Sequence, residues 1–294
     1  MCHKYNVDII EQAYTLLEST EGFLQNTFYL QVAFFENVSD NEYKLFDYKL
    51  KAIRQDFAKI LVTMNSIKRT YSQYCDNKYE STYVSIAEEQ ATSELGCLIE
   101  YMFIKYRVIL EYIQQILEIC ICPRLSDKQK RKYHKKDATY LKYEFLLNYI
   151  AQKEQDNKNL LNTGWFQRLR IDRNLIVHNG ATCVVFGDKE SLLFKLMTTD
   201  AMDNEDDIIY DDFYTNENGL IYYTRYWALQ MAKLIIFSSM VFRYLKGIGS
   251  ISPQTNDMIR KFGLFEENYF VDENGDHLPN IKSVLIDMLN EAKM

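Results

Sequence analysis

The sequence has few residues that interrupt helices, with only 3 proline and 10 glycine residues among 294. Its hydrophobic content is 47%, which excludes a disordered chain and predicts a compact, helix-rich protein. The six cysteines include no Cys-x-x-Cys pair, so reduced thiols are expected rather than a zinc or disulfide framework. The N-terminus also lacks the apolar core of a signal peptide. We therefore expect a cytoplasmic protein.

The sequence also lacks an excess of positive charge and a long uncharged apolar run. Lysine and arginine number 34 against 41 acidic residues, a net charge of −7, which argues against a general nucleic-acid coat protein. An enzyme with a local basic cleft is still allowed, because electrostatic fields are set locally. The most apolar run, Trp227 to Leu245, contains Lys233 and Arg243. These charges favour a buried core helix over a membrane span, and no membrane partner is expected.

Apolar residues recur at helical spacing through most of the chain. The strongest helix is predicted over 87–121, where the pattern is apolar nearly all round and ends before Pro123. Two short helices broken near Gly22, or one bent helix, are predicted within 7–36. A helix over 42–75 follows, and later helices are predicted at 138–153, 160–179, 220–245 and 279–292. Two apolar runs within 182–196, separated by Gly187-Asp-Lys-Glu, predict a β-hairpin.

The predicted fold is therefore mainly α, a helical bundle with a small β-hairpin insertion. We expect one mostly helical domain over 1–294, with a core over 87–246. An N-terminal helical extension over 1–80 and a C-terminal appendage over 250–294 would be added to that core.

One helix-compatible stretch, Trp165 to Gly180, carries the residues most suited to chemistry. It contains Arg173-Asn174-x-x-x-His178, in which Asn174 and His178 are four residues apart and share a helix face. Arg173 has a side chain long enough to reach that face. A permanent cation, an amide and a titratable imidazole would then lie together. These are the groups needed to cleave a phosphodiester without a metal ion.

The stretch resembles the signature of the HEPN superfamily (higher eukaryotes and prokaryotes nucleotide-binding domains). That signature is Arg, a polar residue that is often Asn, three variable residues and His, in an all-helical domain. The resemblance covers six residues and implies catalytic roles for Arg173, Asn174 and His178. It also implies a metal-independent endoribonuclease without a cofactor, usually a homodimer with the motifs facing across the interface. A defence or toxin–antitoxin setting, with an antitoxin or regulatory protein as partner, is a further implication.

In this hypothesis His178 acts as general base or acid on the ribose 2′-OH or the leaving 5′-oxygen. Arg173 would hold the scissile phosphate, and Asn174 would orient the imidazole or bind the phosphate. The expected products are a 2′,3′-cyclic phosphate and a 5′-hydroxyl. A structural interpretation competes with it, because a histidine at a helix C-terminus also favours the helix dipole. The arginines would then form a solvated face with Asp172 as counter-charge.

Further cations could bind the RNA backbone. On the motif helix these are Arg168 and Arg170, and the basic segment 124–142 adds Lys130, Arg131, Lys132 and Lys135. That segment is either a solvated loop between two long helices or an RNA-binding strip. On the long helix, Arg107 and Glu111 would form ion pairs at its rim or face the motif helix.

Two other functions are compatible with the sequence. One is a non-catalytic helical dimer that binds RNA, a nucleotide or a protein partner. The other is a metal-dependent hydrolase built on the acidic segment 200–212, which has no regular ligand spacing. The acidic segment 272–276 does not match an EF-hand, because His277 and Ser283 occupy positions that require Gly and Glu. No metal ion or cofactor is therefore expected.

Overall fold

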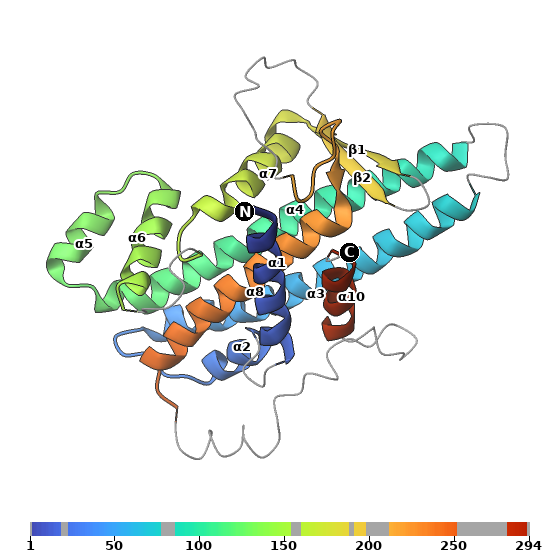
Figure 1. Ribbon diagram of the computed structural model, residues 1–294. Coiled ribbons are helices and arrows are strands. Elements are labelled where there is room, and N and C mark those ends of the chain that lie inside the picture. The colour runs from blue at the N-terminus through green and yellow to red at the C-terminus, as the bar shows by residue number, and fades with distance from the viewer. Residues whose placement is uncertain are drawn as a thin grey trace.

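The computed structural model describes residues 2–18, 23–77, 86–153, 160–187, 191–197, 212–251 and 281–292. This part of the chain is mainly helical and carries one small antiparallel sheet, which confirms the predicted mainly α fold (Figure 1). The acidic segment 200–212, except Asp212, and the acidic segment 272–276 lie outside the described residues.

The helices occur in nearly the predicted places. Their bounds are α1 Cys2–Glu18, α2 Phe23–Gln31, α3 Asp40–Asn77, α4 Ile86–Ile121, α5 Asp127–His134, α6 Thr139–Ala151, α7 Gln167–Asn179, α8 Tyr223–Ile248 and α10 Ile281–Glu291. Short 3-10 turns cover Cys122–Arg124 and Gly164–Phe166. The predicted break between the first two helices is confirmed, since α1 ends at Glu18 and α2 begins at Phe23.

Three long helices, α3, α4 and α8, form the centre of the molecule (Figure 1). The Phe103 ring of α4 packs on Trp227 of α8 at 5.0 Å, and Tyr106 donates a hydrogen bond to the carbonyl of Gln230. Within the described residues α8 alone is long and apolar enough to cross a membrane, but 89% of its apolar window is buried. It is a core helix, as its charged residues predicted.

The terminal helices close this core. α1, α2 and α10 all pack against α8, and their apolar residues join the same hydrophobic cluster as those of α4. Ile10, Leu30 and Leu289 are fully buried there. The extensions at the two ends of the chain are thus packed layers of the bundle.

The predicted hairpin is confirmed as β1 (Thr182–Gly187) and β2 (Leu192–Met197), paired antiparallel from Thr182 opposite Met197 to Gly187 opposite Leu192. A third strand, β3 (Ile221–Tyr222), pairs with β2 and was not predicted. At two residues it is too short for its alternation to be read from sequence. β1 packs on α4 beside the end of α7 (Figure 1).

Two local predictions were wrong. The basic segment 124–142 is not a loop, because Ser126 and Gln129 form a reciprocal capping box that starts α5. The motif helix begins at Gln167 rather than near 160, because the chain first forms a 3-10 turn in which Trp165 and Phe166 pack on Phe237 of α8.

Candidate functional site

The motif helix α7 lies along α4 and is only half buried (Figure 1). Of its side chains, Leu169 and Asp172 are buried, whereas Asn174 and His178 are exposed. Gly180 ends the helix in the left-handed conformation, with φ of 64°. This confirms the predicted C-terminal stop and leaves His178 on the last turn, open to solvent.

The structure brings the three motif residues together. Nη1 of Arg173 lies 3.1 Å from Oδ1 of Asn174 and 3.4 Å from Nε2 of His178. The Arg173 side chain therefore reaches the face shared by Asn174 and His178. Asn174 contacts the guanidinium rather than the imidazole, so its amide positions Arg173.

The contact bears on the tautomer of the imidazole. A guanidinium has only hydrogen-bond donors, so a hydrogen bond from Arg173 requires Nε2 of His178 as the acceptor, in the tautomer that carries its proton on Nδ1. Proton acceptor and anion-binding cation thus share one small surface.

Two more arginines lie next to this group. Arg107 of α4 forms an ion pair with Glu111, at 3.3 Å between Nε and Oε1. Burial lowers the pKa of Arg107, Glu111 opposes this, and the nearby charges of Arg170 and Arg173 lower the pKa further. Arg107 thus lies near the arginines of the motif helix and also forms an ion pair along its own helix. The sequence had offered these two positions as alternatives.

The arginine group made by Arg107, Arg170 and Arg173 is short of acceptors. Nη1 of Arg107 and Nε of Arg170 and Arg173 are buried, and nothing in the described part of the chain accepts a hydrogen bond from them. Arg170 instead lies 5.1 Å from the centre of the Tyr140 ring. Buried donors without acceptors are costly, as are clustered like charges, and a bound anion would relieve both.

Arg168 is separate from this group. Its Nε lies 2.8 Å from Oδ1 of Asp172, whose side chain is 3% exposed. Burial raises the pKa of Asp172 to about 6, against the opposing charge and hydrogen bond of Arg168. The charge of Arg168 is therefore offset on the inner side of α7, and this side chain is a structural ion-pair partner.

The other predicted RNA-binding residues are not at the site. Lys130, Arg131, Lys132 and Lys135 lie on α5 or at its C-terminal end, far from α7 in Figure 1. Arg124, which starts the basic segment, donates to the carbonyl of Ile248 at the end of α8. Within one protomer this basic segment does not converge with Arg173.

Asn174 and His178 of the motif are exposed on α7. A cavity of about 770 Å³ lies between α3, α8, α10 and the sheet, and no motif residue lines it. No three His, Cys, Asp or Glu side chains within the described ranges come together as a metal-binding group. The arrangement suits a large polyanion laid across α7, or a second protein chain that completes the site.

Comparisons with family models, curated proteins and solved structures find no match for this chain. The sequence left Arg107 between two alternatives, an ion pair at the rim of its helix or a position facing α7, because its approach to α7 is a matter of helix packing. The only signal was a charged residue within an otherwise apolar helix.

Proposed function

We propose that this protein is a metal-independent endoribonuclease of the HEPN type. The observation that carries the proposal is the contact of Arg173 with both Asn174 and His178 on the exposed side of α7. Arg107 and Arg170 support it, because their buried donors without acceptors suit a phosphate. The enzyme would work in the cytoplasm, where the buried thiols of Cys120 and Cys183 stay reduced.

The reaction is an internal transfer within RNA. Nε2 of His178 takes the proton of the ribose 2′-OH, and the 2′-oxygen attacks the neighbouring phosphorus. Arg173 leaves Nε2 for the phosphate and offsets the negative charge of the five-coordinate transition state, while the guanidinium keeps its contact with Asn174. The bond to the 5′-oxygen breaks, and this oxygen takes a proton from an acid. The products are a 2′,3′-cyclic phosphate and a 5′-hydroxyl.

One imidazole accounts for only one of the two proton transfers. The other would come from His178 of a second copy, so we propose a homodimer with the site at its interface. Ile171 and Val177 support this arrangement, because they are 39% and 43% exposed on the motif helix. A regulatory protein, such as an antitoxin, could silence the enzyme by covering the same face.

A second candidate function is a non-catalytic dimer that binds RNA, a nucleotide or a protein partner. The exposed apolar residues beside the motif favour it equally, since they serve a protein contact whether or not cleavage occurs. Binding of RNA without any cleavage would distinguish this scaffold from the nuclease.

The test is RNA cleavage by purified protein in EDTA, with the product ends mapped. We expect wild-type protein to leave cyclic phosphates, and His178→Ala and Arg173→Ala to lose at least about a hundredfold in rate. His134→Ala is the matched control, because His134 is exposed on α5, away from the motif. No cleavage of any RNA, equal cleavage by the motif variants, or loss of activity in EDTA would contradict the proposal.

A further inference from the structure

A second surface, formed by α3 and α4, combines lysines with tyrosine rings. We define the lysine–tyrosine strip as Tyr48, Lys49, Lys59, Tyr101, Lys105 and Tyr112. Nζ of Lys49 lies 4.5 Å from the centre of the Tyr112 ring and 5.5 Å from that of Tyr48. Lys105 lies over the Tyr101 ring at 5.6 Å. Cations and rings therefore alternate across the two helices.

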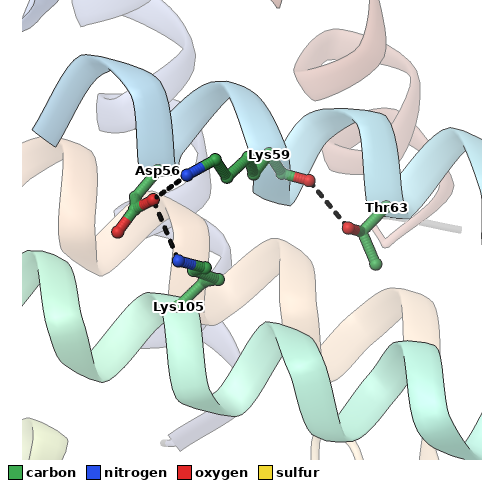
Figure 2. Close-up of polar contacts among 4 residues, drawn as sticks. All are labelled: Asp56, Lys59, Thr63 and Lys105. Atoms are coloured by element: carbon green, nitrogen blue, oxygen red, sulfur yellow. Dashed lines mark hydrogen bonds and ion pairs between the residues drawn. The ribbon is translucent and has the colours of Figure 1, made fainter. Parts of the chain in front are cut away.

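The strip is positive although the whole chain is acidic. Lys59 and Lys105 reach from α3 and α4 to the same oxygen of Asp56, at 2.9 and 3.1 Å (Figure 2). One buried carboxylate thus orders two lysines and neutralises only one of them. In the described part of the chain no acid pairs with Lys49. The strip keeps excess positive charge within a chain of net charge −7.

The strip and the arginine group beside the motif lie on different sides of α4. Glu111, the ion-pair partner of Arg107, is the chain neighbour of Tyr112. Arg107 itself is five residues before Tyr112, about 140° around the helix axis. The strip is therefore a second surface, separate from the motif.

We propose that the lysine–tyrosine strip binds single-stranded RNA. Lysines spaced along a surface neutralise successive phosphates, and tyrosine rings stack on unpaired bases. Tyr48 is 61% exposed, so its ring is free to take a base. An acidic protein would use the lysines but would leave the rings without a role, which favours RNA. This inference rests on the proposed function and names the strandedness of its substrate.

The experiment measures RNA binding separately from cleavage. A fluorescein-labelled single strand of about 12 nucleotides is titrated by anisotropy into the His178→Ala variant, which leaves the RNA intact. We expect Tyr48→Ala to weaken binding about tenfold through lost stacking. Lys49→Ala should weaken binding and reduce the slope of log affinity against log salt by about 0.7, the value for one phosphate contact on a single strand.

Each change has a matched control on the same protein. Lys51→Ala removes the same charge from another side of α3, where Lys51 pairs with Asp47, and Tyr5→Ala removes a partly exposed ring from α1. Both should leave affinity within about twofold. Equal losses in the controls, equal binding of a duplex, or displacement of RNA by polyglutamate as effective as by unlabelled RNA would overturn the proposal.

The outcomes separate the strip from the nuclease. Binding that requires Tyr48 and Lys49, in a protein that cuts no RNA, would support RNA binding by the strip and contradict the proposed nuclease. If the wild-type protein cuts RNA and the Tyr48→Ala and Lys49→Ala variants bind and cut it equally well, the nuclease proposal would be supported and the strip proposal contradicted.

Discussion

At the scale of single residues, Arg107 separates function from stability. Its side chain is 13% exposed, lies near the charges of Arg170 and Arg173, and has Glu111 as its acidic partner. Arg107→Met removes the repulsion and the cost of burying the charge, and it gives up only an ion pair whose Glu111 side is 39% exposed. We expect the free energy of unfolding in urea to stay equal or rise by about 1 kcal/mol. RNA cleavage should fall at least about tenfold.

The matched control for this prediction is Arg69→Met, which removes the same charge from an exposed position on α3. It should change neither stability nor cleavage. If Arg107→Met destabilised the protein and left cleavage intact, Arg107 would be a structural ion-pair residue and the arginine group would lose its role in anion binding.

The positions of some site residues follow from spacing within one helix, whereas the positions of others depend on how helices pack together. Asn174 and His178 could be placed on one face from sequence, because a four-residue spacing fixes their relation within one helix. The inward turn of Arg168 toward Asp172 was not predicted, and the approach of Arg107 to α7 was only one of two alternatives. Both depend on which side of a helix meets its neighbour, and a single helix pattern with charges on several sides does not specify that.

At the scale of elements, two helix glycines make a matched pair. A Cβ on Gly96 of α4 would lie 2.5 Å from the carbonyl oxygen of Cys183 on β1, whereas one on Gly247 of α8 would meet nothing within 4 Å. We expect Gly96→Ala to lower the free energy of unfolding in urea by about 2 kcal/mol, because backbone must move. Gly247→Ala should raise it by about 0.5 to 1 kcal/mol through helix propensity. Equal effects would show that α4 and β1 are not in close contact.

Elements with a strong apolar pattern were predicted well, whereas the short, strongly basic helix α5 was missed. α4 and α8 follow from nearly continuous apolar spacing, and the hairpin follows from two short apolar runs around Gly187. α5 was missed because the segment 124–136, which contains it, carries seven lysine and arginine residues, and because Tyr133 is its one buried side chain. The Ser126-x-x-Gln129 capping box was its available signal.

At the scale of the whole molecule, the proposed dimer can be tested through the motif helix. Val177 on α7 and Val62 on α3 are matched in type and exposure, at 43% and 42%. If α7 forms the interface, Val177→Asp buries an unpaired charge there and weakens association at least about a hundredfold. The mass by light scattering should fall from twice 34.9 kDa to 34.9 kDa, and cleavage should be lost with it. Val62→Asp should keep both.

The folded state of the single chain should survive either change, because both valines are exposed and a surface substitution costs about 0.5 kcal/mol or less. Circular dichroism and urea unfolding of the two variants check this before association is compared. A wild-type protein that cuts RNA as a monomer would place both proton transfers within one chain. A Val177→Asp protein that is still dimeric and inactive would place the interface elsewhere and assign the loss of activity to the motif surface itself.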